Sequence, residues 1–436
     1  LIPEWEPIRA FPQRDLYHRF TVDRHLFTAV AELAASRSLD ERDVHDAWSH
    51  VGDPDALFLA ALFHDVGKGR GGDHSIVGAE IARVCADRIG LSDAQVSDVV
   101  FLVTEHLTLA ETAVRRDLNE PKTIAEVGAR MGDHRRLAML HLLTRADSLA
   151  TGAEAWSSFR ASLVRELYGR TSAYLAGAPV EEIASGPTAM SELVRALELS
   201  PDEAAPLLGP MPESWAIGID VEAARRQLAL LRSPLATDEV RTAVRHTNEA
   251  DEFIVVTGDR PGLFSTVAGV LALRGLDVHD AEVYTRGDGI AVEVFRVVGA
   301  HGPISDERWT KLGDDIAAAS RGDIDLDDAL LKKASQTRRR RGQQRSDVPW
   351  RVVVTNDASE THTVIEIHTT DRVGLLRAMT KALADAGCDL GLAKIATYGV
   401  EVVDVFYVRD LEGLKITDPD RVRAIEERLN AVLAAS

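Results

Sequence analysis

The sequence predicts an all-helical domain followed by two copies of one small α+β module of the ferredoxin-like type, with the element order βαββαβ. Three observations support this fold class. Apolar residues recur at helical spacing as far as about residue 170, strand-like alternation begins at Asp251, and the second half repeats one succession of motifs. We therefore expect a multidomain α + (α+β) chain.

The helical pattern is clearest near the start of the chain. Val22, Leu26 and Leu33 lie on one face of a predicted helix, and strand-like alternation is absent from this part of the sequence. We assign residues 1–170 to the helical domain. Residues 171–249 still read as helices, broken by several prolines, and are expected to form a helical connector.

Two stretches of the second half have the same predicted order of elements: strand, loop, helix, strand, hairpin and strand. At a constant spacing, Asp259 matches Asp371, Arg260 matches Arg372, Gly262 matches Gly374, and Leu263 matches Leu375. The modules are placed at 250–330 and 350–436, joined by a basic linker at 331–349. The arginine run Arg338–Arg341 in this linker is interpreted as solvated, with a basic docking patch as the alternative.

Composition excludes several classes of partner. The 50 basic and 69 acidic residues give a formal charge of −19, which argues against general binding to nucleic acid or anionic membranes. Cys85 and Cys388 fit neither a disulfide nor a metal pattern, which favours a reducing, cytoplasmic location. No bilayer-spanning run or signal peptide is evident. Because the sequence opens on Leu1 rather than Met, we expect it to be a piece of a longer protein.

A set of polar residues on apolar helices indicates a metal site. His25 lies on the apolar face of its helix, His64 and Asp65 are adjacent at the end of another, and Asp147 follows Leu140 and Leu143 on a third. Each residue alone has an ordinary explanation as a satisfied core side chain, a cap or an ion-pair partner. Together, on separate helices, they predict a centre built from inward-facing imidazole and carboxylate ligands.

His25, His64-Asp65 and Asp147 resemble the ligand set of the HD phosphohydrolase superfamily. The segments YHRFTVDRH, HDVGKGRGGDHSIVGA, VTEHL, RRDL and LTRADSLATG are similar to the HD domain of the bacterial PII uridylyltransferase/uridylyl-removing enzyme family. The tandem repeat, with DRPGLFS, DRVGLL, KIATYG and DVFYV, resembles that family's paired ACT domains. The resemblance implies hydrolysis of a phosphodiester on the PII signalling protein, releasing UMP or AMP, with one or two Mg or Mn ions. The ligand types themselves also suit Fe or Zn.

Asp65 has a second expected role, and three further residues are candidates around this centre. Asp65 is expected both to bind metal and to orient water, and Lys68, after Gly67, to contact the phosphate; a solvated lysine is the alternative. His74 and His106 are expected to hold a second metal or to contact phosphate. The alternative for His74 is a position next to a helix that Asp73 caps.

Arg115 and Arg116 are candidates for gripping the nucleotide phosphate or the PII protein, with an exposed helical ion pair as the alternative. For the ACT modules, the resemblance implies glutamine as the effector. It would bind at Asp259–Leu263 or Asp371–Leu375, where glycine admits a ligand to the backbone and the following helix N-terminus favours a carboxylate. These glycines could instead serve only tight turns.

Three functions are consistent with this organisation. We favour a glutamine-regulated phosphodiesterase acting on PII. A (p)ppGpp hydrolase with ACT regulation, and a non-catalytic amino-acid sensor that binds PII, are the alternatives. No Gly-Ser dipeptide of the kind that the family's nucleotidyltransferase domain requires occurs in the sequence, so transferase activity is expected only in a longer parent protein.

Overall fold

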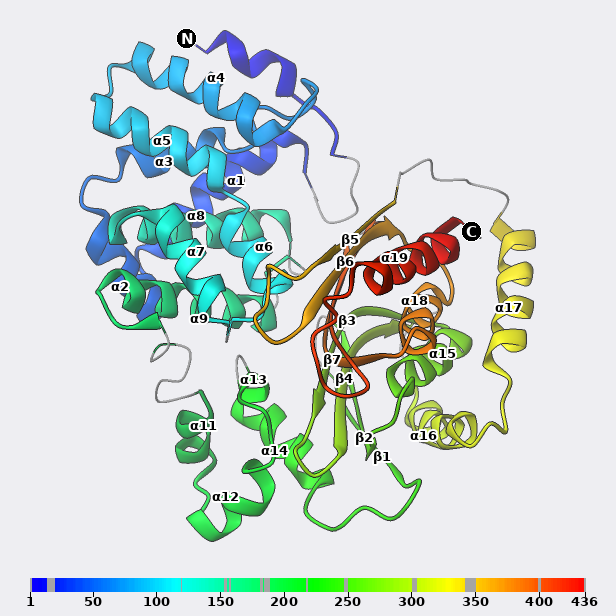
Figure 1. Ribbon diagram of the computed structural model, residues 1–436. Helices are drawn as coiled ribbons and strands as arrows, with labels where there is room; N and C mark the ends of the chain where they lie inside the picture. The colour runs from blue at the N-terminus through cyan, green and yellow to red at the C-terminus, as the bar shows by residue number, and fades with distance from the viewer. Residues whose placement is uncertain are drawn as a thin grey trace. The chain divides into compact units, whose positions relative to one another are not determined.

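The computed structural model describes residues 2–13, 20–118, 120–152, 155–156, 158–180, 183, 189–216, 219–246, 250–299, 304–341, 350–398 and 401–434 (Figure 1). The chain divides into two compact units, Leu1–Gly186 and Pro187–Ser436, called unit 1 and unit 2 below. Within the described residues, no helix has the length and apolar character needed to cross a membrane.

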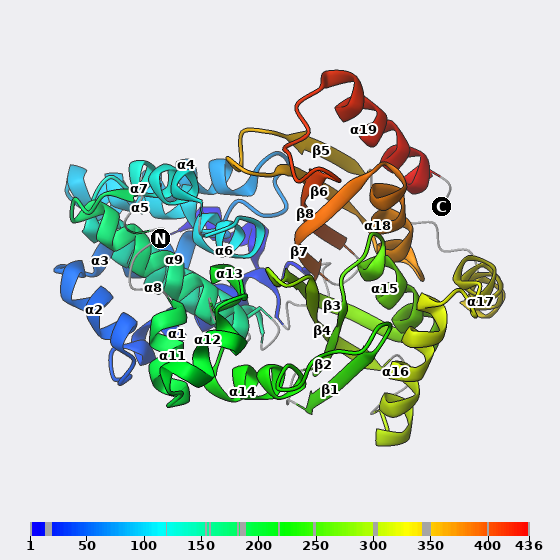
Figure 2. The ribbon, with the colours of Figure 1, turned by 60° about the horizontal axis from the view of Figure 1, so that its bottom comes forward.

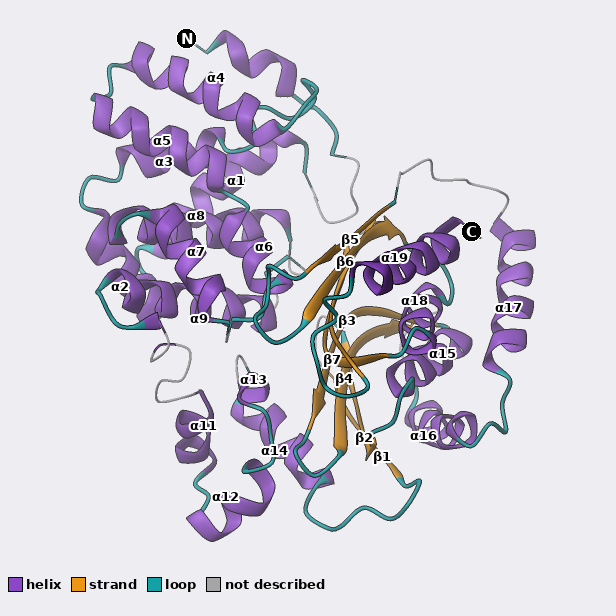
Figure 3. Cartoon of the chain, viewed as in Figure 1, coloured by secondary structure: helices purple, strands orange, loops and turns teal. Residues whose placement is uncertain are grey.

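The described residues of unit 1 form helices and no strands (Figure 3). The elements are η1 (Pro3–Ile8), α1 (Val22–Ser36), α2 (Arg42–Val51), α3 (Asp55–Phe63), α4 (His74–Ile89), α5 (Asp93–Glu105), α6 (Thr108–Arg115), α7 (Pro121–Met131), α8 (His134–Thr151) and α9 (Ser158–Leu175). The central helix is α8, which packs against α1, α2, α3 and α5. It is buried around most of its circumference, which is typical of a helix inside a domain.

Local capping fixes where several of these helices begin. Ser92 and Gln95 form a capping box at α5. The Asp73 side chain accepts a hydrogen bond from the Ser75 backbone N–H at 2.8 Å, so Asp73 does cap the helix that carries His74. The cap sets the direction in which α4 leaves the glycine-rich turn.

Unit 2 begins with helices and continues into two sheets. The helices before the first sheet are α11 (Ala189–Leu197), α12 (Pro201–Leu208), α13 (Glu213–Ala216) and α14 (Val221–Leu230). The first module contains β1 (Val240–His246), β2 (Asp251–Gly258), α15 (Leu263–Arg274), β3 (Leu276–Thr285), β4 (Ile290–Gly299) and α16 (Asp306–Ser320). After α17 (Leu326–Arg341), the second contains β5 (Arg351–Thr355), β6 (Thr363–Thr370), α18 (Leu375–Asp385), β7 (Cys388–Tyr398), β8 (Glu401–Asp410) and α19 (Pro419–Ala434).

Both modules contain a four-stranded antiparallel sheet, with the strand orders β1-β2-β4-β3 and β5-β6-β8-β7. The internal repeat is therefore confirmed, and the bulges in β3 and β7 fall at equivalent positions. The element order within each module, however, is ββαββα rather than the expected βαββαβ. The fourth strand comes from the N-terminal side, and the module ends in a helix.

The weak sequence signal of β1 explains this correction. All its residues except the last are half-buried, as befits an edge strand, so VRTAVRH lacks a clear alternation between apolar and polar positions. The strand lies inside the range 171–249 that was expected to be a helical connector. At the other end of the module, Ser305 precedes α16, whose buried Trp309, Leu312 and Ile316 have helical spacing.

The expected connector is divided between the two units. Its helices α11–α14 belong to unit 2, where they cover one face of the first sheet. Trp215 is buried there, and its indole N–H donates to Gln227 at 2.6 Å. Within the expected linker 331–349, α17 continues to Arg341; residues 342–349 lie outside the described residues.

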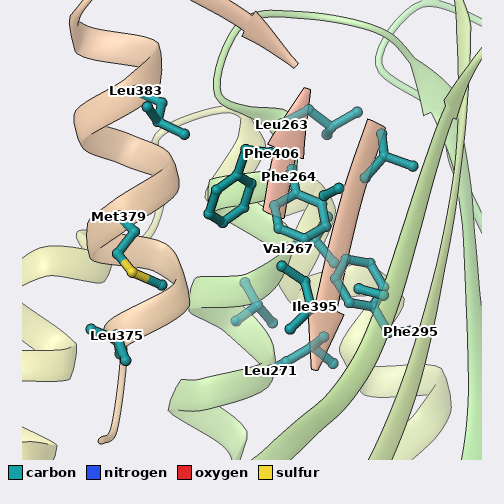
Figure 4. Close-up of a cluster of buried hydrophobic side chains, with 14 of the residues drawn as sticks. Leu263, Phe264, Val267, Leu271, Phe295, Leu375, Met379, Leu383, Ile395 and Phe406 are labelled. Carbon is teal, nitrogen blue, oxygen red and sulfur yellow. The ribbon is translucent and has the colours of Figure 1, made fainter. Parts of the chain in front are cut away.

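The opposite faces of the two sheets share one apolar core. It contains Phe264, Phe295, Met379 and Phe406, and the rings of Phe264 and Phe295 stack with centroids 5.3 Å apart (Figure 4). Helices α15 and α18 lie side by side, as do the edge strands β3 and β7 (Figure 2). The two modules therefore pack against each other and are not separated by an extended linker.

Candidate metal centre

Four helices of unit 1 bring imidazole and carboxylate groups to one place. His25 comes from α1, His64 and Asp65 follow α3, His106 follows α5, and Asp147 comes from the central helix α8. His25, His64, Asp65 and His106 are buried. The side chains predicted from separate parts of the sequence therefore converge in the structure.

The ligand atoms are spaced as they would be around a single ion. Asp147 Oδ1 lies 3.0 Å from His25 Nε2 and 3.3 Å from His64 Nε2, and these two nitrogens are 3.0 Å apart. Asp65 Oδ2 is 3.6 Å from His25 Nε2 and 3.7 Å from His64 Nε2. Ligands ~2.0–2.2 Å from a divalent ion are separated by roughly 3.0–3.6 Å, so the donor set and its spacing fit a metal ion.

A second group of donors adjoins the first through the same carboxylate. Asp65 Oδ1 lies 3.5 Å from His74 Nε2 and 3.7 Å from His106 Nε2. His25, His64 and Asp65 form one possible metal-binding group, and Asp65, His74 and His106 form another. Asp65 thus offers one oxygen to each group, so a single side chain would serve both.

Backbone carbonyls orient two of these imidazoles. His64 Nδ1 lies 3.0 Å from the Ala61 carbonyl, and His106 Nδ1 lies 2.8 Å from the Val103 carbonyl. A carbonyl can only accept, so each Nδ1 carries the proton and donates it. In the neutral ring the Nε2 lone pair then points into the centre, as a metal ligand requires.

The pKa values of the two carboxyl groups and of His106 also suit a cation site. Burial opposes ionisation of Asp147, but His64 and His25 outweigh it and hold the carboxyl pKa well below its usual range. Burial likewise opposes ionisation of Asp65, and Lys68, His64 and His106 together lower its pKa. Burial and the neighbouring His64 lower the pKa of His106 to about 4, so this imidazole is neutral at physiological pH.

The glycine-rich turn lets two parts of the backbone approach closely. A Cβ on Gly67 would lie 2.1 Å from the His74 carbonyl oxygen and 2.7 Å from the Gly78 amide nitrogen. A Cβ on Gly69 would meet the ring of Phe11 at 2.7 Å. The turn therefore holds the start of α4, and with it His74, against the end of α3.

Lys68 projects from this turn toward the centre. Its Nζ lies 2.6 Å from Asp65 Oδ2 and donates to Gln13 Oε1 at 2.7 Å. Gln13 was not predicted from the sequence, because nothing in the pattern joins it to a lysine so far along the chain. The contact places the segment before α1 at the edge of the centre.

The other predicted residues of unit 1 lie on α6. Arg115 is paired with Glu111 at 3.2 Å, one helical turn earlier, and Arg116 is the C-cap of the helix. This pairing has the geometry of the helical ion pair given above as the alternative for Arg115. A role of either arginine toward phosphate stays a prediction.

The two predicted effector loops of unit 2 have the same backbone geometry. Gly262 and Gly374 are the N-caps of α15 and α18, both with φ 79°, a left-handed conformation that favours glycine. Neither helix receives a side-chain cap. In both helices, the backbone N–H groups of the first turn come directly after the loop.

A buried acid beneath the first loop escaped the sequence analysis. Glu293 on β4 is 1% exposed and faces the shared core, and Asp404 takes the equivalent place on β8. Burial, with the nearby Asp259, raises the pKa of Glu293 to about 8, partly offset by Arg260. The signal that could have identified Glu293 is an acidic residue at an inward-facing strand position in both copies of the repeat.

This pKa gives a pH prediction for Glu293→Gln. In the folded chain the pKa is raised from 4.5 to about 8, so the wild-type group favours folding below pH 4.5, and that stability is lost as pH rises toward 8. We expect the melting temperature of Glu293→Gln, relative to wild type, to increase steadily between pH 5 and 8. Over this range, the free energy of unfolding of Glu293→Gln relative to wild type should rise by up to about 1.4 kcal/mol per pH unit. A difference that stays constant over pH 5–8 in thermal melts without amino acid would contradict the assignment.

Comparison with known protein families supports the division seen in the structure. Residues 25–152 match the HD domain family, residues 253–305 match the ACT domain family, and residues 358–436 match the ACR family N-terminal ACT domain. These matches confirm the helical HD domain and the ACT modules that the sequence predicted.

Curated relatives match the chain from end to end. A bifunctional uridylyltransferase/uridylyl-removing enzyme of Gluconobacter oxydans is 36% identical over 465 residues, covering 100% of this chain and 47% of the relative. Proteins of the same name from Rhodospirillum rubrum and Streptomyces coelicolor are each 36% identical, over 99% and 98% of this chain and 47% and 51% of their own lengths. The chain therefore carries an HD domain followed by ACT domains and is homologous over its whole length to about half of the bifunctional uridylyltransferase/uridylyl-removing enzymes, consistent with their C-terminal part.

Proposed function

We propose that unit 1 is a metal-dependent phosphodiesterase that removes UMP, or AMP, from a tyrosyl group of the PII signalling protein, and that glutamine regulates it through the ACT modules. One observation carries the proposal: two adjoining groups of metal-type ligands share Asp65, with Lys68 beside them. The names of the relatives, which include uridylyl removal, favour this substrate class.

The reaction replaces the bond between phosphorus and the tyrosyl oxygen with a bond to a water oxygen, and the leaving phenolate takes up a proton. A divalent ion such as Mg or Mn, held by His25, His64, Asp65 and Asp147, would supply polarisation of the phosphoryl group and a more acidic water. Asp65, whose two oxygens face both ligand groups, would orient that water.

Lys68 contributes positive charge to the same reaction. Its ammonium lies at the Asp65 carboxylate and is held from the other side by Gln13. A cation whose position is already fixed would therefore stabilise the negative charge on the phosphoryl oxygens. In this proposal Gln13 is a positioning residue that acts through Lys68.

The experiment is release of nucleotide from modified PII by this chain, with Mg, Mn, Fe or Zn added singly and with or without glutamine. Release that requires metal and rises with glutamine supports the proposal. If no metal supports release, the phosphodiesterase assignment fails. Hydrolysis of ppGpp in place of PII would move the assignment to the alternative hydrolase, and PII binding without turnover to the sensor.

Lys68→Met tests the charge at the centre. We expect turnover to fall ~10²-fold because a fixed cation is lost from the phosphoryl site. Metal content should stay unchanged, since all the imidazole and carboxylate ligands remain. Lys122→Met, at an exposed lysine on α7, is the matched control and should retain wild-type turnover. Equal rates for the two variants would remove Lys68 from the mechanism.

A further inference from the structure

We propose that the two effector loops are not equivalent: the first, Asp259–Leu263, binds one α-amino acid per chain with its ammonium at Glu293, and the second is occupied by the protein itself. This inference rests on the proposed function only in taking glutamine as the probe. It adds a residue that the sequence analysis missed, and it decides between loops that have the same backbone geometry.

Two buried polar atoms at the first loop lack a hydrogen-bond partner among the described residues: Arg260 Nη2 in the loop and Glu293 Oε2 on the adjacent strand β4. The other terminal nitrogen of Arg260, Nη1, is 3.5 Å from Asp238 Oδ1. Buried polar groups almost always have partners, so two such atoms at one loop indicate groups that a ligand satisfies. One is a cationic donor, and the other belongs to an acid.

The balance of charge at this loop fits a zwitterion. Asp259 raises the pKa values of both Glu293 and Asp389, and Arg260 and Arg409 offset this only in part, so the described residues at this loop carry an excess of acid. An ammonium group would relieve this excess of acid at Glu293. A carboxylate would accept from Arg260 and from the N–H groups at the start of α15, where Gly262 provides no side-chain cap.

The second loop differs from the first at the arginine and at the loop glycine, where protein groups are already in place. Arg372, the counterpart of Arg260, donates through Nη2 to the Val432 carbonyl of α19 at 2.8 Å. Leu330 of α17 packs against Gly374, where a Cβ would lie 3.5 Å from its side chain. One terminal nitrogen of this guanidinium is thus already bound by the protein, and an apolar side chain lies against the loop glycine.

Helix α17 is fixed in this position by two charged contacts. Lys333 Nζ donates to the Ala272 and Leu273 carbonyls at the end of α15, at 2.7 and 3.0 Å. Asp327 at the start of α17 is paired with Arg377 of α18 at 2.9 Å. The helix thereby joins both modules beside the second loop. At the first loop, the neighbour of Gly262 is the small side chain of Ala384, 3.8 Å from a Cβ placed there.

The test is calorimetric titration of the full chain with L-glutamine. We expect one site per chain. Glu293→Gln should weaken binding at least ~10-fold, because a neutral amide cannot balance the ammonium charge. Asp404→Asn makes the same change at the equivalent position of the second module and should bind within ~2-fold of wild type. Arg260→Gln and Arg372→Gln form a second matched pair, with the loss expected only in Arg260→Gln.

Two sites per chain, no heat of binding in the wild type, or equal losses in Glu293→Gln and Asp404→Asn would each overturn the inference. Thermal melts of all four variants check that the fold is retained; an unfolded variant is replaced by the other matched pair. Nucleotide release is measured on the same wild-type preparation. Release without glutamine binding would refute this inference and the glutamine regulation but leave the phosphodiesterase standing, and binding without release would refute the phosphodiesterase alone.

Discussion

Asp65→Asn is expected to lower metal-dependent nucleotide release by ~10³-fold or more, since an ion contributes several kcal/mol to such a reaction. The amide removes the negative charge that faces both ligand groups, with Oδ2 toward His25 and His64 and Oδ1 toward His74 and His106. Metal content measured by elemental analysis should fall together with turnover, because a single side chain serves both groups.

Asp73→Asn is the matched control for this substitution. Asp73 caps α4 through the Ser75 N–H, and asparagine caps a helix about as well as aspartate. This variant should keep its metal and most of its activity. If Asp65→Asn binds metal and turns over like Asp73→Asn, the proposed centre is not where the reaction occurs.

Gly67→Ala is expected to destabilise unit 1 by about 3 kcal/mol or more, the upper range for overpacking. Its Cβ would lie 2.1 Å from the His74 carbonyl oxygen and 2.7 Å from the Gly78 nitrogen, and both are backbone atoms that cannot rotate away. Hydrogen exchange resolved by peptide would measure the loss within unit 1, because the two units need not unfold together. We also expect His74 to be displaced from Asp65, with loss of metal.

Gly169→Ala is the contrasting change in the same unit. Gly169 lies within α9, and among the described residues no atom beyond the adjoining backbone of its own helix is within 4 Å of a Cβ placed there. Alanine in a helix interior should stabilise the unit by roughly 0.5–1 kcal/mol. Similar protection in the two alanine variants would mean that the α3–α4 turn opens more easily than this close approach allows.

The candidate metal ligands could be identified from the sequence because these residue types are unusual in their local pattern. His25 and Asp147 stand on apolar helix faces, where an imidazole or carboxylate is unfavourable unless something pairs with it. The adjacent pair His64-Asp65 marks the point where such groups meet. Their convergence follows from helix packing, which the periodicity of α1, α3 and α8 already implies.

The features that were missed depend on contacts between distant segments. Lys68 meets Gln13 through the path of the chain before α1, and α17 covers the second loop through Leu330 and Lys333. Neither pairing leaves a periodic trace in the sequence. The sequence signal for Glu293 is weak, because a single acid within an apolar strand is equally consistent with a position that faces solvent.

The N-terminal origin of β1 has a practical consequence for dividing the protein into fragments. A fragment that starts at residue 250 would contain both matched ACT segments, yet β2 would lose its antiparallel neighbour. The unpaired N–H and C=O groups of β2, beside the uncovered Ile254 and Val256, would offer a template for association between copies. A fragment that begins at Pro187 keeps β1 and the helices α11–α14, and should remain monodisperse where the shorter one aggregates.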